Sequence, residues 1–320
     1  MKTKAILAGL MLAASAQAYA AYPEQPIKIV VGYAAGGTTD LLARALGEQL
    51  SNELNVPVVI ENKAGAAGSI AATDVEKSKP DGYTVFIATV SSHGMNPSLY
   101  SKLNYDPIEG FEPISMLASI PLVLISNPKL ELRTIDDLVD KIRAEPGKYN
   151  YSSSGNGSPP HIAAAIFSDT ADLKVEHVPY RGGALANTAV IAGDVQFSFA
   201  TLPAALPQVR AGTLTALAVT TAERSPELPD TPAVGENAAF PGYEINTWNA
   251  LLAPKGTPPE VVAKLNEAVV KVMNAEKLQD RFRQEGAIPQ SSTPEELWTF
   301  VKSELSRWDK IVKKLNISIS

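Results

Sequence analysis

The chain has 320 residues, a formal net charge of −6 at pH 7 and no cysteine. This length can bury a large core without disulfides and suggests two lobes rather than one. An acidic chain whose basic residues are scattered is a poor nucleic-acid binder, so no nucleic acid is expected among its partners.

Residues 1–20 are predicted to be a cleaved signal peptide. Two lysines precede the apolar run Ala5–Ala16, which is too short to span a bilayer, and small-x-small cleavage sites end at Ala18 and Ala20. An uncleaved anchor is the alternative interpretation. No later apolar run reaches the roughly 18 residues of a membrane helix, so we expect a soluble protein exported to the periplasm.

The segment Pro26–Leu50 predicts a strand, a tight glycine loop and the start of a helix. Residues 27–31 are strongly apolar, Gly36-Gly37 allows a turn at positive φ, and Thr38-Thr39-Asp40 offers capping side chains. Such a loop directs backbone N–H groups and the positive end of a helix dipole at one point, which suits a small anion. The alternative is a turn that glycine satisfies for steric reasons alone.

The rest of the chain alternates predicted strands and helices. Strands are predicted at 57–61, 83–88, 122–126, 149–152, 175–179, 195–200 and 214–220, and helices at 65–75, 134–143, from Ser158 onward, 184–192, 260–273 and 295–315. Residues 223–242 are proline-rich and irregular. This alternation predicts an α/β fold with parallel strands, whose ligand lies beyond the carboxyl ends of the strands.

Polar or glycine-rich loops follow four of the predicted strands, at 33–40, 89–93, 152–161 and 180–184. Two of them lie in the first third of the chain and two in the middle, as a cleft between two lobes would require. The candidate ligand-binding residues come from these loops and from the end of the strand that contains Phe199. They are Tyr33, Gly36, Gly37, Thr38, Thr39, Asp40, Ser91, Ser92, Ser154, Ser158, His161, Arg181, Gly182, Gly183, Ala184 and Thr201.

Enzyme and metal signatures are missing from the sequence. It contains no G-x-S-x-G, no Walker lysine and no H-E-x-x-H, and its three histidines show no ligand-like spacing. We therefore predict no catalytic residue, no metal site and no cofactor. His161 follows a predicted N-cap at Ser158, so it either orients a ligand or is held by the backbone. An exported hydrolase that uses a hydroxyl of Ser152–Ser154 is the alternative from another class.

Several blocks of the chain, taken in order, resemble the Bug (TctC-like) solute-binding receptors of tripartite tricarboxylate transporters. Each block is weakly specific alone, but together they cover nearly all of the mature chain. The blocks are Tyr22-Pro23-x-x-Pro26-Ile27, Gly36-Gly37-x-x-Asp40-x-x-Ala43-Arg44, Asp81-Gly82-Tyr83-Thr84, Asn96-Pro97-Ser98-Leu99-Tyr100, Tyr105-Asp106-Pro107, Gly155–His161, Pro179–Ala184, Arg224–Asp230 and Ala253–Pro259.

The resemblance implies a two-lobed periplasmic binding protein fold of type II, with mostly parallel sheets flanked by helices. Lobe 1 would comprise residues 21–123 and 247–320, and lobe 2 residues 124–246. It also implies that backbone amides near Gly37–Thr39 and Gly182–Ala184 grip one carboxylate. Gly32, Tyr33 and Leu185 depart from the residues usual in the family, so the choice of ligand does not carry over.

The expected function is therefore the capture of a small organic carboxylate, either aliphatic or aromatic and in the first instance a dicarboxylate. A monomer would close its lobes on the ligand and deliver it to the membrane subunits of a tripartite tricarboxylate transporter. No acidic residue follows Phe199, so an amine-bearing ligand is not expected. A sensor that presents the ligand to a signalling protein is the alternative that the sequence leaves open.

Overall fold

The computed structural model describes residues 22–315, so the predicted signal peptide lies outside the described residues. The strands are β1 (Ile27–Val31), β2 (Val58–Asn62), β3 (Thr84–Thr89), β4 (Phe111–Ser126), β5 (Asn150–Ser153), β6 (Glu176–Pro179), β7 (Phe197–Thr201), β8 (Thr215–Val219), β9 (Asn246–Pro254) and β10 (Ile288–Pro289). The helices are α1 (Thr38–Leu54), α2 (Ser69–Glu76), α3 (Asn96–Leu99), α4 (Ile135–Ala144), α5 (Pro159–Thr170), α6 (Gly183–Ala192), α7 (Leu202–Arg210), α8 (Pro259–Met273), α9 (Glu276–Gln284) and α10 (Pro294–Leu315). Across residues 22–315, every helix is too short or too polar to qualify as a membrane span.

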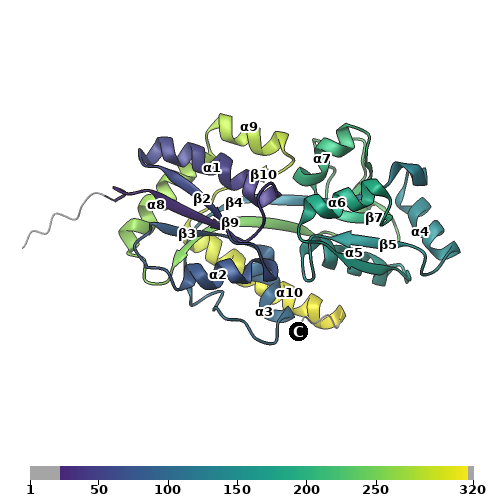
Figure 1. Cartoon of the computed structure of the whole chain (residues 1–320), viewed down its shortest axis with the longest axis horizontal. Coiled ribbons are helices and arrows are strands. Elements are labelled where there is room, and N and C mark those ends of the chain that lie inside the picture. The colour runs from purple at the N-terminus through teal and green to yellow at the C-terminus, as the bar shows by residue number, and fades with distance from the viewer. Residues whose placement is uncertain (1–21, 316–320) are drawn as a thin grey trace, which may run out of the picture.

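The strands form one sheet in the order β2-β1-β3-β9-β4-β7-β5-β6, and β8 and β10 also pair with β4. Strand β1 runs parallel to β2 and β3, and β5 runs parallel to β6 and β7. Strand β9 lies antiparallel between β3 and β4. Helices cover the sheet, which confirms the predicted α/β class (Figure 1).

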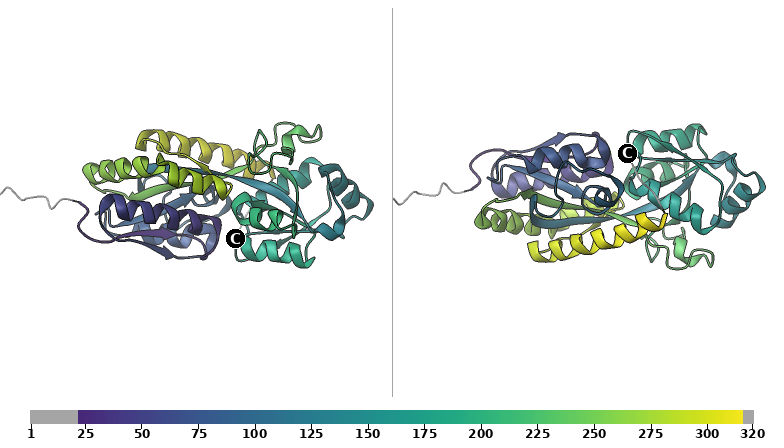
Figure 2. Two further views of the ribbon diagram at one scale, coloured as in Figure 1. Left: turned by 90° about the horizontal axis from the view of Figure 1, so that it is seen from above. Right: turned by 90° about the horizontal axis from the view of Figure 1, so that it is seen from below.

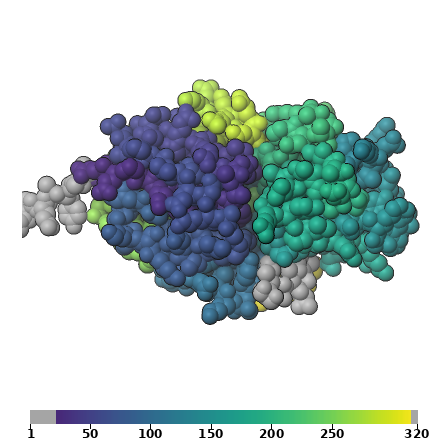
Figure 3. All heavy atoms as spheres, in the orientation of Figure 1, coloured from purple at the N-terminus to yellow at the C-terminus, as the bar shows by residue number. Residues whose placement is uncertain are grey.

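Strand β4 joins the two halves of the molecule. Its first part pairs with β9 as far as Pro121, whereas Leu122–Ser126 pairs with β7 and β8. The halves lie end to end in every view, and their surfaces meet along a seam (Figures 1, 2 and 3). Because β4 runs unbroken across position 123, no chain break marks the predicted boundary between lobes, and those exact limits stay a prediction.

Two cores lie on one face of the sheet and a continuous core lies on the other. On the first face, Leu46 of α1 belongs to a core under α1, α8 and α9, and Leu206 of α7 belongs to a separate core under α6 and α7. On the opposite face, one core runs from Phe86 in the first half to Phe199 in the second. In the second part of β4 the side chains alternate between these cores, since Leu122 and Leu124 face the shared core and Val123 and Ile125 do not.

The structure adds elements that the sequence analysis did not predict. The prediction lacked the first eleven residues of β4, strands β9 and β10, and helices α3, α7 and α9. Helix α7 carries Pro203 in its first turn, where proline is tolerated, and Pro207 in its interior, where proline normally argues against a helix. The predicted polar loop at 89–93 is a buried helical turn, Ser91–Met95.

Candidate functional site

A cavity of about 930 Å³ lies between the halves. The loops that follow β1, β3, β5 and β6 all contribute to its lining, as the sequence analysis expected for four loops at the carboxyl ends of strands. Ile120 of β4 and Thr247 and Asn249 of β9 line the same cavity. Ile120 belongs to the core under α1 and the lining residue Ala200 to the core under α6 and α7, so the cavity lies between these two cores.

The first wall of the cavity is the loop that leads into α1. Gly36 has φ +80°, which confirms the predicted turn at positive φ, but Gly37 has φ −82° and does not use that freedom. Gly37 is the N-cap of α1 and contributes no side-chain hydrogen bond, so the predicted capping by Thr38 and Thr39 is wrong. The first N–H groups of α1 have no intrahelical partner and carry the positive end of its dipole.

The second wall is built in the same way from the other half. Helix α6 begins at Gly183, and its N-cap Gly182 has φ +130°, a conformation that favours glycine. Gly182 likewise offers no side-chain cap. Among the described residues that line the cavity, Arg181 is the one charged side chain. Two helix N-termini and one guanidinium therefore give this cavity a positive character.

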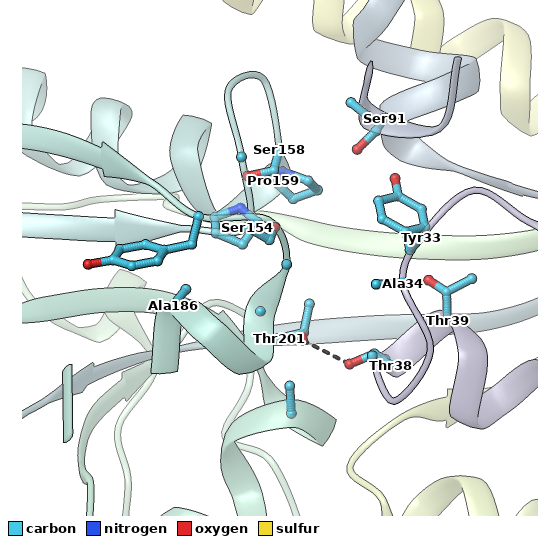
Figure 4. A pocket seen from close by; sticks show the side chains of 18 of the residues that line it. Tyr33, Ala34, Thr38, Thr39, Ser91, Ser154, Ser158, Pro159, Ala186 and Thr201 are labelled. Atoms are coloured by element: carbon cyan, nitrogen blue, oxygen red, sulfur yellow. Dashed lines mark hydrogen bonds between the residues drawn. The ribbon is translucent and has the colours of Figure 1, made fainter. Parts of the chain in front are cut away.

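One hydrogen bond crosses the cavity directly. The hydroxyls of Thr38 on α1 and Thr201 at the end of β7 lie 2.9 Å apart, and either can donate (Figure 4). These residues are 163 positions apart in the sequence and belong to opposite halves. The contact joins the start of α1 to the end of β7, where Thr201 is the N-cap residue of α7.

Asp40 supports the first wall from behind and does not line the cavity. Its carboxylate accepts hydrogen bonds from the N–H of Gly36 at 2.8 Å, from Nε of Arg44 at 3.0 Å and from Nδ2 of Asn62 at 2.9 Å. Burial by itself would raise the pKa of this carboxyl, but these hydrogen bonds together hold the pKa below its ordinary value. The buried, ionised carboxylate thereby fixes the loop that contains Gly36.

His161 holds the loop before α5, and it too lies outside the lining. Its Nδ1 accepts the N–H of Gly157 at 3.1 Å, and its ring stacks on that of His177 with 3.9 Å between centroids. Nε2 of His177 lies 2.6 Å from the hydroxyl of Ser153, a pairing that sequence spacing did not reveal. Because the hydroxyl of Ser153 also donates to the carbonyl of Gly155, this group braces the loop.

The remaining predicted residues fall into two groups, those that line the cavity and those that do not. Gly36 and Ser92 do not line the cavity, and the Ser92 hydroxyl bonds within its own turn to Thr89 and to Nδ1 of His93. Ser158 caps α5 as predicted, with Pro159 at the first helical position. The predicted residues that the structure does bring together around the cavity are Tyr33, Gly37, Thr38, Thr39, Ser91, Ser154, Ser158, Arg181, Gly182, Gly183, Ala184 and Thr201 (Figure 4). Contact of any of them with a ligand stays a prediction.

Other lining residues escaped the sequence analysis. The loop Ala64–Ala67 follows β2 and is rich in glycine and alanine, so the rule that found the other loops also applies to it. Thr247 and Asn249 lie inside a strand and carry no comparable signal. Within residues 22–315, no group of three or more histidine or acidic side chains is arranged to hold a metal ion.

All three histidines are neutral in the folded protein at neutral pH. Burial lowers the pKa of His161 to about 4. Burial and the adjacent His161 lower the pKa of His177 to about 3. His93 is fully buried, and this burial lowers its pKa to about 3. In the unfolded chain, each imidazole returns to a pKa of about 6.5.

We therefore expect the free energy of unfolding to fall as the pH drops from about 7 to about 5. In this window the unfolded histidines bind protons and the folded ones do not, so stability declines with falling pH. Urea unfolding at several pH values measures the slope. The double variant His161→Gln/His177→Gln should flatten it, because glutamine keeps a hydrogen-bond acceptor but does not titrate. An unchanged slope in this variant would contradict the assignment.

Two α/β halves joined by antiparallel strands around a central cavity are the architecture of the periplasmic binding protein fold. The chain belongs to the TctC family, because the model described as tripartite tricarboxylate transporter family receptor matches residues 42–317. This confirms the family resemblance that the sequence blocks indicated.

Relatives and solved structures agree with this assignment. Protein BugT of Bordetella pertussis is 33% identical over 294 residues, which span 92% of this chain and 90% of BugT. The structure of R. palustris Rpa4515 with adipate has a TM-score of 0.90 at 34% identity and covers 93% of this chain and 99% of that one. MatC from Rhodopseudomonas palustris, with bound malate, has a TM-score of 0.85 at 30% identity and covers 91% of this chain and 100% of its own.

Proposed function

We propose that this receptor captures a small organic carboxylate in the cavity between its halves. The observation that carries the proposal is the pair of uncapped helix N-termini, α1 and α6, which line one cavity from opposite halves. Backbone N–H groups and helix dipoles at such termini bind a carboxylate well. Among the described lining residues, Arg181 carries the one charged side chain, and its positive charge attracts an anion.

Solved relatives support the same class of ligand. Rpa4515 is described with adipate and MatC with bound malate, and adipate and malate are both dicarboxylates. We extend this class to the present chain and propose aliphatic and aromatic dicarboxylates as the first ligands to screen. The lining combines the rings of Tyr33, Tyr100 and Phe199 with hydroxyl groups, which suits an apolar body between polar ends.

The proposed function also involves export and a membrane partner. We propose that residues 1–20 direct export to the periplasm and are removed. The ligand-bound receptor would then be recognised by the membrane subunits of a tripartite tricarboxylate transporter. Membership of the receptor family supports this role over that of a sensor for a signalling protein.

A thermal-shift screen of carboxylates tests the ligand class. A ligand at one hundred times its dissociation constant adds about 2.7 kcal/mol to the stability of the folded state. We expect a clear rise in unfolding temperature for at least one small carboxylate and no rise for its methyl ester, which lacks the charge. If no carboxylate raises the unfolding temperature at millimolar concentration, the proposed ligand class is wrong.

A further inference from the structure

Two deeply buried polar side chains line the cavity without a hydrogen-bond partner among the described residues. Asn249 of β9 is 1% exposed, and neither its Nδ2 nor its Oδ1 is paired. The hydroxyl of Ser91, which is 0% exposed, faces the Tyr33 hydroxyl but has no partner in hydrogen-bonding geometry among the described residues. Buried polar atoms in folded proteins are almost always hydrogen-bonded, so these groups need a partner that the cavity supplies.

The two groups belong to one wall of the cavity. Asn249 lies directly opposite Thr89 in the antiparallel register of β9 and β3, so the two side chains share a face of the sheet. The hydroxyl of Thr89 is 2.9 Å from that of Tyr33, and Figure 4 shows the Tyr33 hydroxyl directed toward Ser91. We call Tyr33, Thr89, Ser91 and Asn249 the hinge-side polar wall, because β9 pairs there with the joining strand β4.

The chemistry of this wall differs from that of the helix N-termini. A carboxamide offers donors at Nδ2 and an acceptor at Oδ1, and a serine hydroxyl can do either. An ionised carboxylate only accepts hydrogen bonds and would leave Oδ1 of Asn249 unpaired. The one charged side chain of the described lining, Arg181, comes from the loop after β6 in the other half. The wall therefore suits an uncharged group that both donates and accepts.

We propose that Asn249 selects ligands that carry a hydroxyl or a carboxamide in addition to the carboxylate held by the helix N-termini. This inference rests on the proposed function and adds a determinant of specificity to it. Asn249 would pair with the uncharged group, and the Ser91 hydroxyl would take the remaining hydrogen bond. A site built to hydrogen-bond a polar group discriminates strongly against an analogue that lacks it, because its own buried atoms then stay unpaired.

Calorimetric titration with matched acids tests the proposal. The pairs are succinate and malate, glutarate and 2-hydroxyglutarate, adipate and its monoamide, and benzoate and 4-hydroxybenzoate. In at least one pair, we expect the hydroxyl- or carboxamide-bearing acid to bind wild-type protein roughly tenfold to a hundredfold more tightly. Asn249→Leu, similar in size but without hydrogen-bonding atoms, should abolish this preference and keep the affinity for the plain acid.

Two further variants make the result specific. Asn246→Leu is the matched control, because Asn246 lies on the same strand outside the cavity lining and its replacement should preserve the preference. Ser91→Ala should reduce the preference in part, and it provides an independent test if Asn249→Leu unfolds at a much lower temperature than wild type.

The outcomes separate the two proposals. If acids bind but neither Asn249→Leu nor Ser91→Ala changes the preference, or if the plain acid binds as tightly in every pair, the role of the wall is overturned and the carboxylate function stands. If no acid binds wild-type protein, the carboxylate function fails and the role of the wall fails with it.

Discussion

Replacing Gly37 by valine is expected to weaken carboxylate binding by well over tenfold, with little change in the unfolding temperature. Gly37 has φ −82° and ψ 166°, a conformation that valine adopts readily. A Cβ atom at this position would come no closer than 3.5 Å to Ala34 O, so the fold tolerates the side chain. The branched side chain would nevertheless stand in the cavity directly before the N–H groups of α1 and keep a carboxylate from approaching them.

Calorimetry with the best ligand of the thermal-shift screen measures this effect. Gly37→Ala, with a smaller side chain, should show an intermediate loss, and the unfolding temperature of each ligand-free variant reports whether the fold is intact. Wild-type affinity in Gly37→Val would place the anion site elsewhere in the molecule.

Closure of the two halves is expected to depend on both walls of the cavity. Only a ligand that binds the closed state better than the open state can shift the equilibrium between them. The Thr38–Thr201 hydrogen bond joins the walls directly, and the N-termini of α1 and α6 would share the carboxylate. Gly183→Val should prevent closure, because its branched side chain would stand at the start of α6, where the ligand is expected. The fold should tolerate this change, since a Cβ atom at this position would lie 3.9 Å from Ala204 Cβ, an ordinary contact distance.

Small-angle X-ray scattering measures closure in solution. A saturating carboxylate should reduce the radius of gyration of wild-type protein, whereas Gly183→Val should show no reduction and an unchanged ligand-free profile. Thr201→Val keeps the shape of the side chain but loses the hydroxyl, and it should weaken binding by roughly twofold to tenfold. Identical wild-type scattering with and without saturating ligand would rule out hinge closure, even if calorimetry confirmed binding.

Asp40 and His161 lie in the predicted loops, but they hold those loops in place and do not line the cavity. Both lie in the loops that the sequence analysis selected, and both were candidates for ligand contact. In the structure, the Asp40 carboxylate binds the N–H of Gly36 and the His161 ring binds the N–H of Gly157. A polar side chain in a loop can hydrogen-bond to the nearby backbone instead of to a ligand, and sequence alone does not separate these roles.

The sequence by itself determined the features that depend on near neighbours in the chain. The strand and glycine turn before α1, the Ser158 cap and Pro159 start of α5, and the glycine loop after β6 all follow from apolar periodicity, glycine and proline. These local rules, applied in chain order, also predicted the α/β class, whereas the family was predicted from the resemblance of whole sequence blocks.

Only the tertiary structure decided which side chains meet across the cavity. Thr38 and Thr201 contact each other over 163 residues of sequence, and Asn249 lies beside Thr89 because β9 inserts antiparallel between β3 and β4. A shift of one residue in that register would turn Asn249 away from the cavity and into the opposite core. The local sequence pattern specifies where each strand forms, but the pairing register between strands decides which way its polar side chains face. That register depends on how the buried faces of the whole sheet pack together.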